Sequence, residues 1–278
     1  MAHDGTTFED DWIVLRRVGG PHVTSVDGVL VARTLRKALM SAYGPDVPEI
    51  LSGHRVSGQP SEHAHLAYVP LPWIGEAEAD GGIHGVALVL PRRATNAERF
   101  AVYRALDGWE RGAASGDAKP GSLPVHLGKL GVLLLARIEA ASEGEGQGTA
   151  PTLDPNTWCA GSTTWASATP VALDRNPGEL RSSDPAKAAS AKAEAEAIVA
   201  LACERIGLPR PARVTVELGV PFAGAQDARR FPAFAAGNPA VQRLLVHAKL
   251  VFDGEVRGPI LLGAGRYFGL GMFRPLRE

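Results

Sequence analysis

Cysteine is nearly absent from this chain of 278 residues, which contains only Cys159 and Cys203. Two cysteines are too few for a disulfide framework, and neither belongs to a Cys-x-x-Cys pair of the kind found in zinc and redox sites. Both are expected to be small core residues of a protein in a reducing cytoplasm. The sequence therefore excludes a small secreted domain that depends on disulfides.

Long hydrophobic runs are absent as well. No apolar stretch approaches the length of about 20 residues that a transmembrane helix requires. The acidic N-terminal segment, residues 1–11, has none of the features of a signal peptide. We therefore expect a soluble protein without a membrane partner.

Neither sign of charge prevails, because 29 Lys and Arg face 30 Asp and Glu. A neutral total argues mildly against a nucleic-acid partner. The distribution is uneven, however: residues 229–278 hold eight basic and three acidic side chains, whereas acids collect at 76–80 and 139–145. A basic face is therefore compatible with this composition.

Several catalytic and nucleotide-binding motifs are missing. There is no Gly-Lys-Ser/Thr phosphate loop and no Gly-x-Ser-x-Gly nucleophile elbow. Neither cysteine lies beside a plausible base. These absences disfavour a P-loop nucleotidase and a nucleophilic hydrolase.

Glycine is concentrated near the C-terminal end, in the glycine loop (residues 258–275). Glycine lets the backbone adopt positive φ and approach a ligand closely, while arginine and aromatic rings bind phosphates and stack on bases. We predict that this loop binds RNA; the alternative is a turn that closes the last strand. A dinucleotide fingerprint does not fit, because the third glycine comes one residue too late. Four glycines frame a basic and aromatic triplet: Gly263, Gly265, Gly269 and Gly271 around Arg266, Tyr267 and Phe268.

The hydrophobic pattern of residues 8–145 predicts a β-α-β-β-α-β order. Asp27 and Thr95 are expected to cap the two helices, and Gly44 to end the first. This order is that of the ferredoxin-like split βαβ, in which two helices cover one sheet face and leave the other free to bind. The expected strands are 12–18, 65–70, 83–90 and 131–138, and the helices are 27–43 and 95–111.

Residues 150–278 repeat this order less regularly. A strand at 165–173 is interrupted by Pro170, and a helix opens at Asp184 and continues to Ile206. Strands at 214–218, 243–252 and 271–273 follow, and residues 140–150 are typical of a linker. We therefore predict an α+β protein of two tandem ferredoxin-like (RRM-like) domains, 8–145 and 150–278, of which the second is degenerate.

The chain resembles the RAMP superfamily of CRISPR proteins, and in particular the repeat-RNA endoribonucleases within it. It is similar to the processing half of the fused subunit of type I-U (I-G) CRISPR systems. The strings that carry this resemblance are residues 50–54 (ILSGH), 65–75 (HLAYVPLPWIG), 85–92 (GVALVLPR), 165–175 (WASATPVALDR), 202–208 (ACERIGL), 228–234 (ARRFPAF) and 258–275.

The resemblance implies an enzyme that cuts CRISPR repeat RNA without a metal or other cofactor. The 2′-OH upstream of the scissile phosphate attacks it, which leaves a 2′,3′-cyclic phosphate and a 5′-OH. This reaction needs a base, an acid and cations for the phosphorane charge, and histidine suits the first two roles. The implied partners are repeat RNA, its crRNA product and other subunits of a type I-U effector complex.

Among the eight histidines, His54 is the preferred acid or base, because it lies in a polar loop between Ser52 and Arg55. His65 at the start of a strand is the second candidate, and Tyr43 is a minor candidate for an auxiliary acid. His54, His63 and His65 are an unfavourable zinc trio, because alternate residues of a strand point to opposite faces. The remaining histidines are weaker candidates: His3, His22, His84, His126 and His247.

Phosphate contacts are predicted for basic residues outside the glycine loop. In the segment ARRFPAF, arginines alternate with aromatics that are able to stack on RNA; the alternative is that Phe231 and Phe234 pack inward. A helix that carries several arginines is a candidate for gripping an RNA stem, or is simply solvated. The predicted phosphate contacts are Arg55, Lys129, Arg229 and Arg230.

Two hypotheses for the function therefore stand. The first is the metal-independent endoribonuclease, and the second is a non-catalytic crRNA-binding subunit of the same assembly. A ferredoxin-like cofactor-binding protein without an RNA role is a third, weaker alternative. Cleavage of repeat RNA in EDTA distinguishes the first hypothesis from the others.

Overall fold

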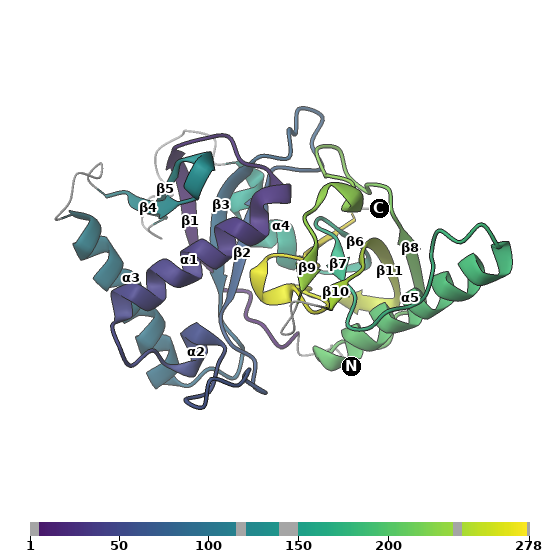
Figure 1. Cartoon of the computed structure of the whole chain (residues 1–278), viewed down its shortest axis with the longest axis horizontal. Helices are drawn as coiled ribbons and strands as arrows, with labels where there is room; N and C mark the ends of the chain where they lie inside the picture. The colour runs from purple at the N-terminus through teal and green to yellow at the C-terminus, as the bar shows by residue number, and fades with distance from the viewer. Residues whose placement is uncertain (1–5, 115–120, 139–149, 236–240, 277–278) are drawn as a thin grey trace.

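The computed structural model describes residues 6–114, 121–138, 150–235 and 241–276. It shows an α+β protein in which two five-stranded antiparallel sheets lie beside one another, each with its own helices (Figure 1). A separate two-stranded ribbon pairs residues 234–235 with 242–243. The predicted linker at 140–150 lies almost wholly outside the described residues.

The first sheet contains five strands in the order β2-β3-β1-β5-β4, and every neighbouring pair is antiparallel. Helices α1 and α3 pack against each other and cover one face of this sheet (Figure 1). The order of elements predicted for this half is therefore confirmed, with β4 and the short helix α2 as additions. The elements are β1 (Ile13–Gly19), α1 (Gly28–Tyr43), α2 (Glu49–Ser52), β2 (Ala67–Pro72), β3 (Ile83–Val89), α3 (Asn96–Ala114), β4 (Leu123–His126) and β5 (Val132–Arg137).

Local chemistry fixes both long helices of this half. Before α1, the Asp27 carboxylate accepts a hydrogen bond from the Thr24 backbone N–H at 3.1 Å, and Gly44 ends the helix with φ of 109°. Before α3, Thr95 and Glu98 form a reciprocal capping box. The predicted helix starts are therefore close to the observed ones.

The second sheet is built around the long strand β11. Strands β12, β6 and β11 lie in that order, and both β7 and β8 pair with β11. Pro170 separates β6 from β7, as the sequence predicts, because proline cannot donate to the ladder. The elements are α4 (Asn156–Cys159), β6 (Ser162–Ser167), β7 (Val171–Ala172), α5 (Pro185–Arg205), β8 (Arg213–Glu217), β9 (Phe234–Ala235), β10 (Gln242–Arg243), β11 (Leu245–Val256) and β12 (Phe273–Pro275).

Helix α5 covers one face of the second sheet. The Asp184 carboxylate accepts from the backbone N–H groups of Ala186 and Lys187, and Pro185 occupies the first turn. Small buried residues such as Ala195 and Cys203 let the helix approach the sheet closely. Between β11 and β12 the chain forms the short 3-10 turn η5 (Arg266–Phe268) within the glycine loop.

The face of the first sheet opposite its helices is not free to bind, which corrects the expectation from the sequence. Strand β2 is buried along its whole length, and Val69 and Val89 pack against Trp158, Leu261 and neighbouring side chains of the second half. The continuous apolar runs of β2 and β3 are the sequence signal, because strands buried on both faces read this way rather than alternating. The two halves therefore share an apolar core.

Candidate active site

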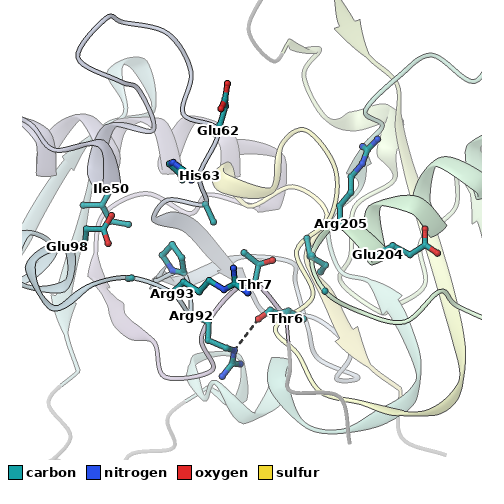
Figure 2. A pocket seen from close by; sticks show the side chains of 15 residues that line it. Thr6, Thr7, Ile50, Glu62, His63, Arg92, Arg93, Glu98, Glu204 and Arg205 are labelled. Atoms are coloured by element: carbon teal, nitrogen blue, oxygen red, sulfur yellow. Dashed lines mark hydrogen bonds between the residues drawn. The ribbon is translucent and has the colours of Figure 1, made fainter. Parts of the chain in front are cut away.

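A cleft of about 670 Å³ lies between the two halves (Figure 2). Arg92 and Arg93 before α3 line one side, and Glu204 and Arg205 at the end of α5 line the other. A neighbouring pocket of about 280 Å³ shares Arg205 with the cleft and extends to the glycine loop at Arg266 and Tyr267. The cleft and the neighbouring pocket therefore present several arginines to solvent.

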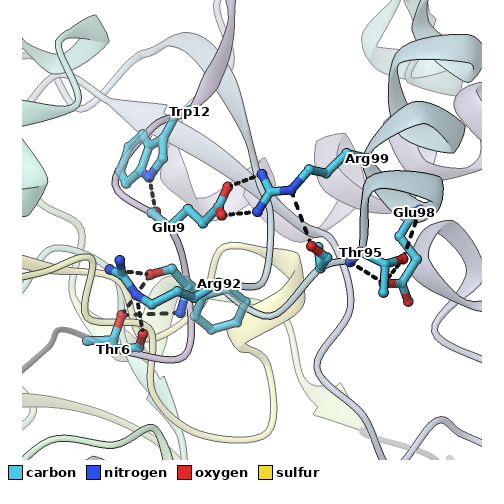
Figure 3. Close-up of polar contacts among 9 residues, drawn as sticks. Thr6, Glu9, Trp12, Arg92, Thr95, Glu98 and Arg99 are labelled. Atoms are coloured by element: carbon cyan, nitrogen blue, oxygen red, sulfur yellow. Dashed lines mark hydrogen bonds and ion pairs between the residues drawn. The ribbon is translucent and has the colours of Figure 1, made fainter.

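The N-terminal segment forms the floor of this cleft and joins both halves. The Thr6 hydroxyl donates to the Pro259 carbonyl at 2.8 Å, and the Thr7 N–H donates to the Ile206 carbonyl at 2.8 Å. Arg92 donates to the Thr6 and Phe8 carbonyls (Figure 3). These bonds link the segment to the first half through Arg92 and to the second half through residues 206 and 259.

Glu9 and Arg99 anchor the same segment to α3. The Arg99 guanidinium donates to both carboxylate oxygens of Glu9, and the Arg99 side chain also reaches the Ala94 carbonyl (Figure 3). Hydrogen bonding to Glu9 raises the pKa of Arg99. Arg99 is therefore part of the scaffold rather than a free contact for an RNA stem.

His54 lies at the end of α2 in an exposed turn. Gly53 adopts φ of 62°, and the Ser52 hydroxyl bonds to both the backbone N–H and the carbonyl of His54. The imidazole Nδ1 is 2.8 Å from the Ser52 carbonyl oxygen and 3.1 Å from Nη2 of Arg36 on α1. The Nδ1 edge of an otherwise exposed histidine is thus held in place.

His65 lies on the other side of Gly53 and is half-buried. A Cβ at Gly53 would lie 2.6 Å from Nε2 of His65, so only glycine fits between the two histidines. The His65 ring stacks on Tyr267 of the glycine loop with centroids 3.6 Å apart, and its Nδ1 is 3.1 Å from the Leu66 carbonyl oxygen. Strand β2 begins at Ala67, so His65 precedes the strand that it was expected to open.

Burial, opposed by the Leu66 carbonyl contact, lowers the pKa of His65 to about 4. His65 is therefore neutral at pH 7. A general base works best when its pKa is near the working pH. Of the two predicted histidines, exposed His54 is the better candidate for the proton-transfer role.

The low pKa of His65 predicts acid-sensitive stability. The unfolded chain binds a proton near pH 6.5 and the folded chain only near pH 4, so stability is complete above pH 6.5 and is lost as the pH falls between these values. The free energy of unfolding, measured with urea, should be lower at pH 4.5 than at pH 7. His65→Gln should reduce this difference by on the order of 2–3 kcal/mol. An unchanged difference between the two pH values would contradict this assignment. Burial also lowers the pKa values of His84 and His247, so both contribute to the slope that remains.

The glycine loop presents its side chains to the first half. Tyr267 packs edge-on against Phe8 at 5.9 Å in addition to its stack on His65. Arg266 lies over the Tyr267 ring and donates to the Gly263 carbonyl at 3.1 Å. Phe268 reaches α1, where Arg36 lies over its ring. The structure therefore brings together the predicted residues His54, His65, Arg266, Tyr267 and Phe268.

The four glycines that frame the Arg266–Phe268 triplet are buried. Gly263, Gly269 and Gly271 have positive φ, and a Cβ at each would approach the Ala172 carbonyl, Pro70 and the Leu262 carbonyl within 2.4 Å. Gly265 has φ of −99°, and a Cβ there would meet Leu270 at 2.8 Å. The glycines fix the path of the loop by close packing, so the parts available to a ligand are the side chains between them.

Tyr43 and Lys129 lie apart from this cluster. Tyr43, at the end of α1, packs under the guanidinium of Arg104 from α3 at 4.7 Å. Lys129 is exposed in the turn η2 (Gly128–Leu130) between β4 and β5. The order of the first sheet places that turn at the opposite edge from β2, about 19 Å away at ordinary strand spacing.

The other predicted phosphate contacts have acidic or polar partners. Arg55 pairs with Glu62 at 2.7 Å, which places the His54 turn beside the cleft. Arg229 pairs with Asp227 and Arg230 donates to Gln226. Phe231 and Phe234 are buried, so in the segment ARRFPAF the inward-packed alternative holds.

The remaining described histidines have varied environments. His22 faces Asp80 at 3.4 Å, and His84 lies beside Trp73. His247 is buried and contacts the Ser167 hydroxyl and the Gln226 carbonyl, as expected of a satisfied core residue. In the part of the chain that the structure describes, no three His, Cys, Asp or Glu side chains gather in a way that would hold a metal ion.

Arg36 of the cluster was missed from the sequence, as was its exposed neighbour Arg33 outside the cluster. Both lie on α1, and their guanidinium groups lie 5.4 and 5.7 Å from the centre of the Phe268 ring. The helix at 27–43 was predicted from its apolar side alone. A basic pair at i and i+3 on its polar side was the available signal.

Comparison with known proteins gives the family. The sequence model described as CRISPR-associated protein, GSU0054 family, matches residues 22–275. The chain therefore belongs to this CRISPR-associated family. No curated protein matches the chain. Among the described residues, no helix is both long and apolar enough to cross a membrane.

Proposed function

We propose that this CRISPR-associated protein is a metal-independent endoribonuclease that cuts CRISPR repeat RNA. The observation that carries the proposal is the environment of His54. Its ring is exposed, its Nδ1 edge is anchored by the Ser52 carbonyl and Arg36, and it stands beside the arginine-lined cleft. An exposed, oriented imidazole beside fixed cations is the arrangement that 2′-OH attack on a phosphodiester needs.

The fold supports this proposal. The first sheet orders its strands β2-β3-β1-β5, and the second places β8, β11, β6 and β12 in the corresponding positions. We infer that both halves are ferredoxin-like, with the glycine loop replacing the second helix of the second half. The tandem arrangement agrees with the resemblance to the RAMP superfamily, and with the type I-U branch within it.

Each residue of the cluster has a proposed role. His54 takes the proton of the 2′-OH as its oxygen bonds to phosphorus, the P–O5′ bond breaks, and the leaving 5′-oxygen takes a proton from water, so that the product ends are a 2′,3′-cyclic phosphate and a 5′-OH. Arg266, Arg93 and Arg205 hold the RNA backbone along the cleft, because guanidinium groups pair with phosphate in a bidentate manner, and Arg205 exchanges its ion pair with Asp174 for phosphate. His65 is neutral and stacked, so its role is to support the site. The proposed partners are repeat RNA, the crRNA product and other subunits of the effector complex.

Cleavage of cognate repeat RNA in excess EDTA tests the proposal. We expect the rate in EDTA to equal the rate in magnesium within about twofold, because no step requires a Lewis acid. Mass spectrometry of the fragments should show the cyclic phosphate and the 5′-OH. Binding of the repeat without cutting under either condition would contradict the enzyme assignment and favour the non-catalytic crRNA-binding subunit.

A further inference from the structure

Two consecutive residues of the glycine loop contact the two groups that flank His54. Tyr267 stacks on His65 at 3.6 Å, and the Phe268 ring supports the Arg36 guanidinium at 5.7 Å. Gly269, the next residue, packs directly on Pro70 of β2, where a Cβ would lie 2.4 Å from Pro70 Cδ. The loop from the second half is therefore held against the strand that leads from the His54 region.

Arg36 connects this loop to the His54 turn. Its Nη2 donates to the Ser52 carbonyl and also lies 3.1 Å from Nδ1 of His54. Arg36 is half-buried on α1, and burial lowers its pKa. Its Nε is buried without a hydrogen-bond partner among the described residues. Burial of a charged group and of an unpartnered Nε is unfavourable, so neighbouring side chains must hold the guanidinium in place. The aromatic ring of Phe268 is one of these neighbours.

The hydrogen-bond inventory decides which nitrogen of His54 carries the proton. The Ser52 carbonyl oxygen can only accept, and arginine can only donate. With Nδ1 unprotonated, two acceptors would face each other at 2.8 Å without a hydrogen between them. With Nδ1 protonated, the carbonyl oxygen accepts from both Arg36 and His54, which uses its two lone pairs, and the 3.1 Å approach of Arg36 Nη2 to Nδ1 is a contact of two donors rather than a hydrogen bond. The carbonyl contact is the shorter of the two, so it favours this second arrangement. The second arrangement leaves the Nε2 lone pair free on the exposed side of the ring.

We propose that Phe268 and Arg36 are positioning residues that hold His54 as the Nδ1–H tautomer, with Nε2 directed outward as the base. Phe268 supports the Arg36 guanidinium, Arg36 fixes the Ser52 carbonyl, and that carbonyl accepts the Nδ1 proton. The glycine loop thus acts on the chemistry of the first half through packing as well as through contact with RNA. The catalytic role of this tautomer rests on the proposed function, whereas its presence in the protein does not.

Nuclear magnetic resonance of the protein without RNA tests the tautomer directly. Long-range ¹H–¹⁵N correlation of the eight histidines, with His54 identified from a His54→Asn variant, reports which ring nitrogen carries the proton. At a pH where the ring is neutral, we expect the Nδ1–H form to dominate in the natural protein. In Arg36→Met and Phe268→Leu, the Nε2–H form should become the major one, whereas Phe268→Tyr should keep the natural pattern.

Arg33→Met is the matched control. Arg33 lies over the same Phe268 ring at 5.4 Å but is exposed, and its guanidinium has aromatic contacts with Phe268 and Phe234 rather than a contact with His54. Its loss removes an equivalent cation–π contact on the same helix. We expect the His54 tautomer to be unchanged in this variant. A changed tautomer in Arg33→Met would instead indicate a general loosening of α1.

Cleavage provides the second readout. At saturating protein, Arg36→Met and Phe268→Leu should lower the single-turnover rate about 10-fold or more, because a misplaced base loses alignment. Phe268→Tyr and Arg33→Met should cut at the natural rate. An Nε2–H form in the natural protein, or a tautomer that persists in both loss variants, would overturn the positioning proposal. If the tautomer responds as expected but neither the natural protein nor any variant cuts RNA, the positioning proposal stands and the nuclease assignment fails.

Discussion

Replacing His54 with alanine should lower single-turnover cleavage of repeat RNA by about 100-fold or more, the usual scale for loss of a general acid or base. Affinity for the RNA should change little, because the exposed imidazole has its Nδ1 edge held by the protein and contributes mainly to proton transfer. Rates measured with excess enzyme, beside equilibrium binding by filter retention, separate the two effects.

His63→Ala is the control for this experiment. His63 is exposed and lines the cleft, nine residues after His54, so its loss tests whether any histidine at this surface matters. It should cut at the natural rate. A repeat with one 2′-deoxy nucleotide just upstream of the break gives the background, because the attacking oxygen is missing. Normal cutting by His54→Ala together with loss in His65→Ala would transfer the catalytic role to His65.

Substituting Gly271 with alanine should destabilise the fold by about 3 kcal/mol, through left-handed backbone strain and overpacking together. Gly271 has φ of 67°, and a Cβ there would lie 2.0 Å from the Leu262 carbonyl oxygen. Neither the strain nor the clash can relax without moving β12. The midpoint of urea unfolding should therefore fall, at an unchanged slope.

Gly128→Ala separates strain from crowding. Gly128 has nearly the same φ of 62°, but nothing lies within 4 Å of a Cβ built there. Its substitution should cost only about 1–2 kcal/mol, the backbone term alone. Equal losses at Gly128 and Gly271 would show that packing around the glycine loop contributes nothing, which would contradict the close fit described above.

Much of the fold could be predicted from local signals. The helices at α1, α3 and α5 follow from apolar periodicity and from the predicted N-cap residues Asp27, Thr95 and Asp184. The Asp27 carboxylate bonds to the Thr24 N–H and not to the first turn of α1. The turns α2 and α4 and the strand β4 were missed, because segments of four residues are too short to show a period. The last strand was displaced from 271–273 to Phe273–Pro275, within the usual uncertainty of element ends.

The candidate site was predicted only as separate pieces. His54, His65 and the Arg266–Phe268 triplet each stood out by residue type, but more than 200 positions in the sequence separate the histidines from the triplet. Arg36 was missed, because an arginine on the polar side of an amphipathic helix looks solvated until its partners are known. The face of the first sheet opposite α1 and α3 was predicted to be free, but the second half buries it. Periodicity does not show which surface covers a strand.

The sequence by itself determined the α+β order of elements, the caps that start the helices and the glycines that allow positive φ, because these depend on neighbours within a few residues. The tertiary structure decided which of its histidines is held at Nδ1 and exposed, and which is stacked and neutral at pH 7. Burial and hydrogen bonding set those differences, and both arise from surfaces that meet only when the second half packs its glycine loop against β2 and α1.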